Sequence, residues 1–299
     1  MYSPILAIIF GLLGTIILHI SKAMQRQGIE IFDQIRSKIK HQSSETQADS
    51  KKPTIYIIGL ILNNSIGIFN GLGTMFGPPS LVTGMFGFGL IALMLYSSKI
   101  LREKVTTKKY LASLLIVIGT GLIGIDGIVR EEISVVDIDY TGLIAFTIMI
   151  YIIAAPLLYF TLKTKKLTGL SFGLMSGAFG GMSPFFFGVA QKYGGGEGFL
   201  PINFVGWLYL GVALLLGSSA FLTTQWGFAR RADASLLVPS YNTTYIILPV
   251  LAIGLLLPNY GFSSLVILGI AIMVPGLYMM QISSIVPNIP HNDEKPKNE

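Results

Sequence analysis

The sequence predicts an all-α integral membrane protein in which about nine transmembrane helices form two inverted repeats. Of its 299 residues, 52% are hydrophobic and only 12% are charged, whereas about one quarter of the residues in soluble domains are charged. The apolar residues gather in nine segments, each near the ~20 residues that cross a hydrocarbon core as a helix. The basic residues gather in alternate connections between these segments.

The segments follow one another with short connections, so each is expected to be one helix. The first lacks the basic region and the cleavage site of a secretory signal and is expected to be retained. The predicted spans are 4–21, 54–75, 79–99, 109–128, 140–161, 169–190, 203–225, 234–257 and 261–283.

The charge pattern predicts the orientation. Nineteen of the 21 Lys and Arg residues fall in the connections 22–53, 99–109, 162–168 and 226–233 or in the tail after 284. By the positive-inside rule these segments are cytoplasmic, which places the N-terminus outside and the C-terminus inside a plasma or inner membrane. The formal charge of +6 therefore reflects topology and contact with anionic lipids, and no nucleic-acid partner is predicted.

Two segments are too polar to cross the membrane. A cytoplasmic interfacial helix followed by a linker is predicted at 29–53, and a disordered cytoplasmic tail at 287–299. The first repeat then occupies 1–128 and the second half 129–286. The sequence is compatible with a homodimer but does not indicate an oligomeric state.

An internal repeat relates the two halves. A shift of 155 positions aligns SLVTGMF (80–86) with SLLVPSY (235–241). Spans 1–4 recur as spans 6–9 with span 5 between them, and an offset of five helices inverts the second copy. Inverted repeats are typical of secondary transporters, whose substrate site lies near the midplane between the repeats. Channels can also contain them, so the repeat favours a carrier without excluding a channel.

Several motifs carry a family resemblance over nearly the whole chain. The stretches are SKAMQRQGI (21–29), FGPPSLVT (76–83), KILREKVT (99–106), IGTGLIGI (118–125) and SLLVPSYN (235–242). Together they resemble the drug/metabolite transporter (EamA-like) superfamily, most closely its NIPA-like magnesium transporter branch. The resemblance implies solute transport, with Mg²⁺ as the substrate in that branch. In the NIPA-like branch, the second span carries a Gly-Glu-x-x-Asn motif. This chain has the Asn of that motif as Asn70 but has Gly67 at the position of the Glu.

The second span carries a polar stripe that is a candidate substrate surface. Asn63, Gly67, Asn70 and Thr74 are spaced i, i+4, i+7 and i+11, so they share one helical face. Polar groups inside a bilayer turn toward a neighbouring helix or a wet cavity. An equal alternative is hydrogen bonding between helices with Gly67 at a close contact. Thr83 of the third span is included in the candidate site.

The eighth span offers a second candidate wall. Tyr241, Thr244 and Tyr245 share a face with Asn242 beside them, and the run is bracketed by Pro239 and Pro249. These prolines are expected to loosen the helix, although a purely structural role is an equal alternative. Spans 2, 3 and 8 are thus predicted to enclose the site.

Other residues are expected to have structural or gating roles. Glu103 is expected to cap the fourth span or to form a cytoplasmic gate pair, and Asp233 to cap the eighth. Pro79, Pro239 and Pro249 belong to the same group. His19 is expected to be a hydrogen-bonded structural residue, and intramembrane Ser and Thr residues such as Ser183 and Thr224 are mostly expected to bond backbone.

Catalysis and cofactors are not predicted. The chain has no cysteine, and it lacks the HExxH, GxSxG and P-loop motifs, so we do not expect an enzyme. No carboxylate lies deep in a predicted span. If Mg²⁺ is the substrate, it is therefore expected to pass in hydrated form, and no protein ligands for it are predicted.

Three interpretations remain. The first is an alternating-access carrier, with a divalent cation slightly favoured over a small polar organic metabolite. The second is a passive channel with a continuous polar pore. The third is a non-transporting scaffold, which requires the Asn63 stripe to be fully paired between helices.

Overall fold

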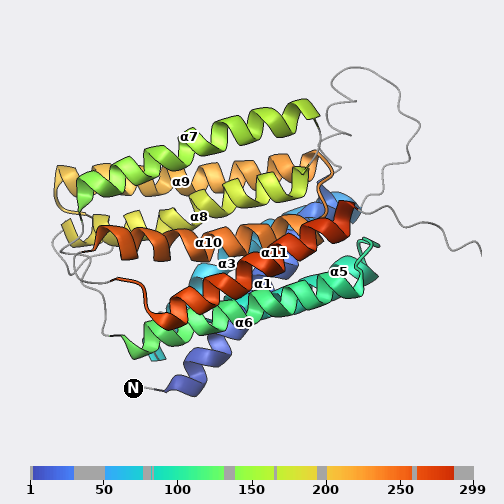
Figure 1. The fold of residues 1–299 in the computed structure, drawn as a ribbon, viewed down its shortest axis with the longest axis horizontal. Helices are drawn as coiled ribbons and strands as arrows, with labels where there is room; N and C mark the ends of the chain where they lie inside the picture. Colours follow the sequence, from blue (N-terminus) through green and yellow to red (C-terminus); the bar gives the residue numbers. More distant parts are fainter. Residues whose placement is uncertain are drawn as a thin grey trace, which may run out of the picture.

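A computed structural model describes residues 3–29, 51–76, 82, 84–130, 139–164, 167–193, 201–257 and 261–285. This part of the chain is helical (Figure 1), as predicted. The helices are α1 (Pro4–Gly28), α3 (Lys51–Phe76), the single turn η1 (Phe86–Phe88), α5 (Gly89–Lys99), α6 (Thr107–Val129), α7 (Tyr140–Thr164), α8 (Thr168–Tyr193), α9 (Phe204–Ala229), α10 (Ala234–Leu256) and α11 (Ser264–Ile285).

Seven of the described helices, α1 and α6 to α11, are long and apolar enough to cross a membrane. Of the predicted third span, the described residues form an apolar helix over Phe86–Lys99. The beginning of this span falls partly on residues outside the described part. The predicted interfacial helix and most of its linker, and the tail from 287, also lie outside the described residues.

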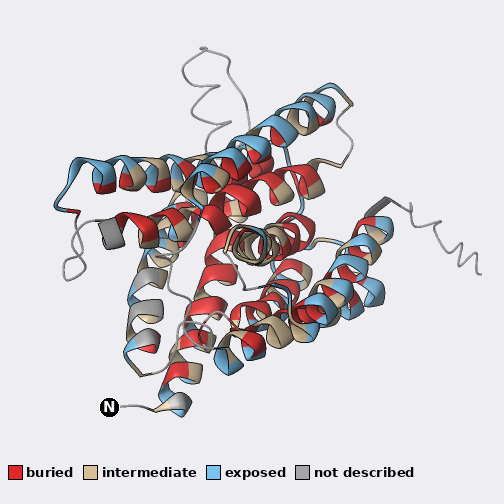
Figure 2. Ribbon diagram, turned by 60° about the vertical axis from the view of Figure 1, so that its left-hand side comes forward, coloured by how far each residue is buried: buried red, intermediate tan, exposed pale blue. Residues whose placement is uncertain are grey.

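The outer surface is apolar, as expected for helices that face lipid. Large side chains on the outside of α7 and α9 are mostly exposed, among them Ile152 (64%), Leu214 (62%) and Leu222 (64%). Figure 2 shows exposed residues along the outer faces of the helices and buried residues in the middle of the bundle. A soluble monomer rarely exposes so much contiguous apolar surface. The protein is therefore membrane-embedded.

The helices pack in two groups. In the first, α1 packs against α3 and α5; in the second, α8 packs against α9 and α10. Helix α6 packs along α11, and α7 packs on the outside of α8 (Figure 1). Helix α10 also contacts α1, α5 and α6, so it joins the two groups.

Alternate connections meet at the same end of the bundle. Arg26 Nε donates a 2.8 Å hydrogen bond to the carbonyl of Ala232, and Glu103 accepts one from the N–H of Ala234. This end, which we call the basic end, carries Arg26, Arg102, Lys104, Arg230 and Arg231. At the opposite end, the N–H of Ser3 donates to Phe76, that of Asp139 to Leu256, and the Arg130 guanidinium to Gly261.

Among the lysines that the sequence analysis counted in connections, Lys22 and Lys109 are buried within helices. Helix α1 continues to Gly28, past the predicted end at residue 21, and Lys22 is only 5% exposed. Lys109 is the third residue of α6 and is 2% exposed. Helix α3 also starts earlier than predicted, at Lys51, because Pro53 is tolerated in a first helical turn.

Candidate functional site

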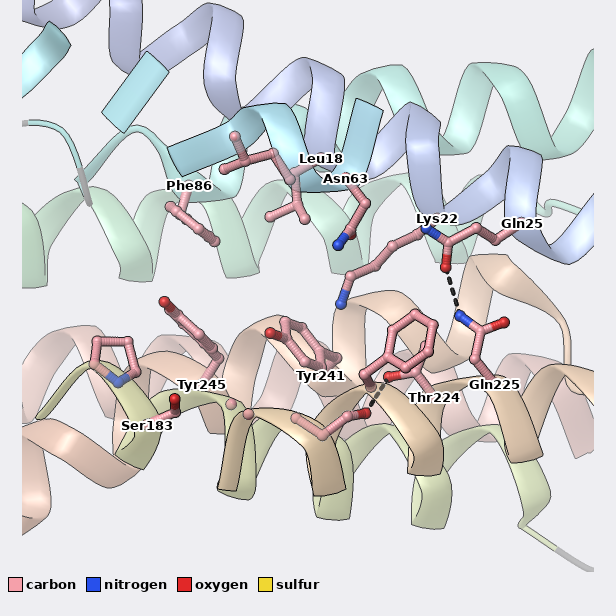
Figure 3. Close-up of a pocket in the computed structure, with 16 residues that line it drawn as sticks. Leu18, Lys22, Gln25, Asn63, Phe86, Ser183, Thr224, Gln225, Tyr241 and Tyr245 are labelled. Atoms are coloured by element: carbon pink, nitrogen blue, oxygen red, sulfur yellow. Dashed lines mark hydrogen bonds between the residues drawn. The ribbon is translucent and has the colours of Figure 1, made fainter. Parts of the chain in front are cut away.

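A cavity of about 260 Å³ lies between the two helix groups. Residues of α1, α3 and η1 line one side, and residues of α8, α9 and α10 line the other (Figure 3). The sequence analysis predicted walls from spans 2, 3 and 8; the structure adds α1, α8 and α9. The polar side chains of the lining are Lys22, Gln25, Asn63, Ser183, Thr224, Gln225, Tyr241 and Tyr245.

Three stacked rings form one wall of the cavity. The ring centroids of Phe86 and Tyr245 are 5.2 Å apart, and those of Tyr245 and Tyr241 are 5.5 Å apart. The two tyrosines stack because residues four apart lie on the same face of a helix. The cavity thus has an apolar, aromatic face that can hold the flat or aliphatic part of a solute.

Close contact with α8 fixes the position of this wall. A Cβ at Gly177 would overlap the carbonyl oxygen of Tyr241, and a Cβ at Gly181 would lie 2.5 Å from that of Tyr245. Pro249 cannot donate a hydrogen bond to the Tyr245 carbonyl four residues earlier. Gly181 therefore approaches a carbonyl that the helix leaves free, and α10 is held against α8 along the aromatic wall.

Lys22 is the basic group of the described cavity lining. Its Nζ atom lies 2.9 Å from the centroid of the Tyr241 ring, a cation–π arrangement. Among the described residues, no side chain or carbonyl forms a hydrogen bond or an ion pair with this ammonium. Figure 3 shows the side chain extending from α1 into the space between Asn63 and Tyr241. Because an ionisable group at membrane depth is costly to keep, Lys22 makes this cavity the candidate functional site.

Other polar groups of the lining also lack partners. Within the described part of the chain, the hydroxyls of Tyr241 and Tyr245 and the amide of Asn63 form no hydrogen bond. In contrast, Ser183 donates to the carbonyl of Ala213 and Thr224 to that of Ala220, as expected for intramembrane hydroxyls. Three groups therefore remain free to bind a solute beside the ammonium.

A network of glutamines separates the cavity from the basic end. Gln225 Nε2 donates to Gln25 Oε1 (Figure 3), and the Tyr56 hydroxyl donates a 3.0 Å hydrogen bond to Gln225 Oε1. Gln25 Nε2 in turn donates to the carbonyl of Gly59 at 3.2 Å. These bonds link α1 and α3 to α9 across the two helix groups. We call Gln25, Tyr56 and Gln225 the glutamine latch.

Asn242 and Thr244, which were also predicted as substrate-binding residues, are not among the residues that line this cavity. Asn242 is fully buried and its amide contacts His19 Nε2 at 2.6 Å, while His19 Nδ1 lies 2.7 Å from the Thr15 carbonyl. A carbonyl can only accept, so Nδ1 carries the proton and Nε2 accepts from the amide. His19 is therefore structural, as predicted. Thr244 donates to the Ser240 carbonyl of its own helix.

Of the other predicted site residues, Asn63, Tyr241 and Tyr245 are brought together in the cavity. Gly67, Asn70 and Thr74 lie in α3, but their side chains fall outside the described residues, as do Pro79 and Thr83 altogether. The sequence analysis missed Lys22, Gln25 and Gln225. Lys22 and Gln25 are three residues apart, so they share a helix face. This spacing would have indicated a common polar face if the first helix had been expected to continue past residue 21.

Glu103 takes the capping role that the sequence analysis predicted for Asp233. The Asp233 side chain makes no capping bond at the start of α10. Instead, the Glu103 carboxylate accepts hydrogen bonds from the N–H groups of Ala234 at 2.7 Å and Ser235 at 2.8 Å. Glu103 thus caps α10 from a distant connection, rather than the fourth span that follows it. It satisfies two backbone donors that a helix start leaves free.

Helix α10 is continuous through Pro239 and Pro249, which the sequence analysis expected to loosen it. Pro239 also contributes its carbonyl as the acceptor for the Thr243 hydroxyl at 2.9 Å. The packing of α8 and the cap from Glu103 hold the helix together across both positions.

A metal centre was not found in the described part of the chain, where no three His, Cys, Asp or Glu residues lie close enough to hold an ion. The arrangement instead offers one ammonium, neutral hydrogen-bonding groups and an aromatic wall. Comparison with protein-family models, with curated proteins and with solved structures gives no match to this chain.

Proposed function

We propose that the protein is a secondary transporter that moves a small polar organic solute by alternating access. The observation that carries this proposal is the cavity between the two helix groups, in which Lys22, Asn63 and the tyrosine hydroxyls form no hydrogen bond or ion pair with the described residues. Groups left unpaired at membrane depth are costly unless a ligand or water satisfies them. A solute site is the economical explanation for such a set.

The pairing of helices supports two inverted repeats. If α1, α3, α5 and α6 correspond to α8, α9, α10 and α11, each main contact of the first half has a counterpart in the second. The α1–α3 contact then corresponds to α8–α9 and the α1–α5 contact to α8–α10, while α6–α11 joins equivalent helices. A carrier built in this way places its site between the halves, where the cavity lies.

In the proposed topology the chain crosses the membrane nine times. Helix α3 and the segment that ends in α5 join the seven long apolar helices, and the N-terminus lies outside with the basic end in the cytoplasm. In this orientation the glutamine latch lies on the cytoplasmic side of the cavity. The described conformation would then be closed toward the cytoplasm. The resemblance to the drug/metabolite transporter superfamily accords with this arrangement.

The cavity favours an organic solute over the divalent cation of the NIPA-like branch. Its described lining contains the ammonium of Lys22 and no carboxylate. A positive charge in a water-poor site repels Mg²⁺, which requires oxygen ligands and is usually held by carboxylates. The aromatic wall of Phe86, Tyr245 and Tyr241 offers apolar contact area, which does not stabilise a hydrated ion.

The remaining interpretations receive less support. A passive channel requires a continuous polar path, whereas the glutamine latch crosses the space next to the cavity. A scaffold requires the polar stripe to be paired between helices, yet Asn63 has no hydrogen-bond partner among the described residues.

Solute exchange in proteoliposomes tests the proposal. Vesicles are loaded with a uniformly ¹³C-labelled extract of small metabolites, diluted into the unlabelled extract, and analysed by mass spectrometry. We expect a small set of solutes to exchange saturably, and to leave faster when the same solute is present outside, which a channel does not produce. A magnesium-sensitive dye inside parallel vesicles measures Mg²⁺ uptake.

A pair of tryptophan variants connects the exchange to the cavity. Thr224→Trp fills the cavity from α9, whereas Leu222→Trp adds the same side chain at a position of α9 that is 64% exposed on the outer surface. Exchange should be lost in the first variant and kept in the second. Equal exchange by both folded variants, or no more exchange by the wild type than by protein-free vesicles, would refute the carrier.

A further inference from the structure

The ammonium of Lys22 is an unbalanced charge in the middle of the proposed site. It is 5% exposed, and the ring of Tyr241 is the described group that faces it most closely. An aromatic ring compensates only part of the energy that an ammonium loses when it leaves water. The titratable neighbour on its own helix, His19, is neutral in the hydrogen-bond arrangement described above and supplies no negative charge.

None of the helices packed around Lys22 supplies the missing counter-charge from its described residues. The cavity side chains from α3, η1, α8, α9 and α10 are neutral, and include Asn63, Gln225 and Tyr245. The described carboxylates lie elsewhere: Glu103 caps α10, and Asp126 pairs with Arg130 at the opposite end at 3.3 Å. A protonated Lys22 therefore has no counter-charge among the described residues, and a bound anionic solute would supply one.

We infer that the cavity binds a small organic anion, in which a carboxylate pairs with Lys22 and an apolar body lies against the aromatic wall. The amide of Asn63 and the hydroxyls of Tyr241 and Tyr245 supply further donors to the carboxylate oxygens. Phe86 and the two tyrosine rings receive the remainder of the molecule. This inference rests on the proposed transport function, because it names the class of solute that the carrier would move. It concerns binding, however, and can be tested without measuring flux.

The volume of the cavity limits the size of the anion. Its 260 Å³ equals about nine water molecules at ~30 Å³ each and lies below the ~300–1,000 Å³ typical of pockets for drug-sized ligands. An amino-acid-sized or single-ring carboxylate fits, whereas a nucleotide or a two-chain lipid does not.

Three single-ring probes of similar size and different charge test the inference. Benzoate, benzamide and benzylammonium are titrated into the purified, detergent-solubilised full chain, and their affinities are measured from the rise in unfolding temperature. We expect benzoate to bind at least about tenfold more tightly than benzamide, because a charge-assisted pair is roughly twice as strong as a neutral hydrogen bond. Benzylammonium and Mg²⁺ should give no shift.

Variants of Lys22 assign the preference to this side chain. Lys22→Met keeps the length of the chain without the charge and should reduce the ratio of benzoate to benzamide affinity to about one, while Lys22→Arg should restore part of it. Lys109→Met is the matched control, because it also removes a buried lysine, one that donates to Ser235 outside the cavity. It should keep the wild-type ratio.

The outcomes separate this inference from the proposed function. Equal affinity for the three probes, binding of none of them by the folded wild type, or an unchanged ratio in folded Lys22→Met would overturn the anion site. If benzoate binds through Lys22 but the vesicles exchange no solute, the anion site stands and the carrier fails. If the vesicles exchange only neutral or cationic solutes, the carrier stands and the anion site fails.

Discussion

The carboxylate of Glu103 caps a helix that begins 131 residues later in the chain, by accepting a 2.7 Å hydrogen bond from the N–H of Ala234. A second bond, from the N–H of Ser235, occupies the other carboxylate oxygen. The connection between α5 and α6 thereby holds the start of α10, the helix that carries both cavity tyrosines. The cap joins the first helix group to the second at the basic end.

Removal of this cap should destabilise the protein. Glu103→Ala leaves two donors of α10 without their acceptor, and loss of an N-terminal cap costs about 0.5–2 kcal/mol. Asp233→Ala should change stability much less, since the Asp233 side chain makes no capping bond. The unfolding temperatures of the two variants in detergent make the comparison. Equal destabilisation, or a larger effect of Asp233→Ala, would contradict the cap assignment.

The contact of Gly177 with α10 should tolerate no side chain. Gly177→Ala places a methyl group against the carbonyl of Tyr241, and overpacking of this kind costs about 1–3 kcal/mol. Gly188→Ala on the same helix meets nothing within 4 Å and should be neutral or stabilising, because Ala favours helix by up to ~1 kcal/mol over Gly. Chromatographic yield and unfolding temperature distinguish the two. A less stable Gly188→Ala than Gly177→Ala would refute the close packing of α8 on α10.

Asn242 should matter for stability rather than for solute recognition. Asn242→Leu removes the donor to His19 Nε2 and leaves a buried acceptor unpaired, at a cost of about 1–3 kcal/mol. Thr244→Val loses a hydroxyl that bonds only its own helix and should cost less. A thermal unfolding comparison tests the order. If Asn242→Leu keeps full stability but loses solute binding, the original prediction of a substrate-binding Asn242 is restored.

The glutamine latch should have to open during transport. The chain contains no cysteine, so Gln25→Cys/Gln225→Cys can be linked by a short, reducible bis-methanethiosulfonate without side reactions at other thiols. Linkage should stop solute exchange, and reduction should restore it. Gln27→Cys/Tyr96→Cys is the matched control, because these residues share a 2.7 Å hydrogen bond within one helix group. Full exchange by the linked latch pair would exclude movement at this position.

The helices were predictable because their signal is local. Runs of about twenty apolar residues indicate spans directly, and α7 to α11 begin and end within a few residues of the predicted segments. The pairing of Tyr241 and Tyr245 could also be predicted, since residues four apart share a helix face. The exception is the third span, whose described helix runs over Phe86–Lys99 as the single turn η1 followed by α5, with Gly87 inside that turn and Gly89 at the start of α5.

Most of the cavity could not be predicted, because its contacts join distant parts of the chain. A lysine that follows an apolar run usually marks the end of a span, and only the Tyr241 ring, more than 200 residues away, shows that Lys22 is inside. The bond between Gln25 and Gln225 has no local pattern either. The same holds for Glu103, whose nearest helix start in the sequence is α6 although it caps α10.

Accessibility of the cavity from both sides of the membrane is the most direct test of the central claim. Ser183→Cys introduces the chain's first thiol at a half-buried position that lines the cavity, and membrane-impermeant reagents are applied to either face of oriented vesicles. An alternating-access carrier predicts labelling from each side, with Leu222→Cys on the lipid-facing surface unlabelled. Labelling of Ser183→Cys from neither side, or from one side under every condition, would contradict the account.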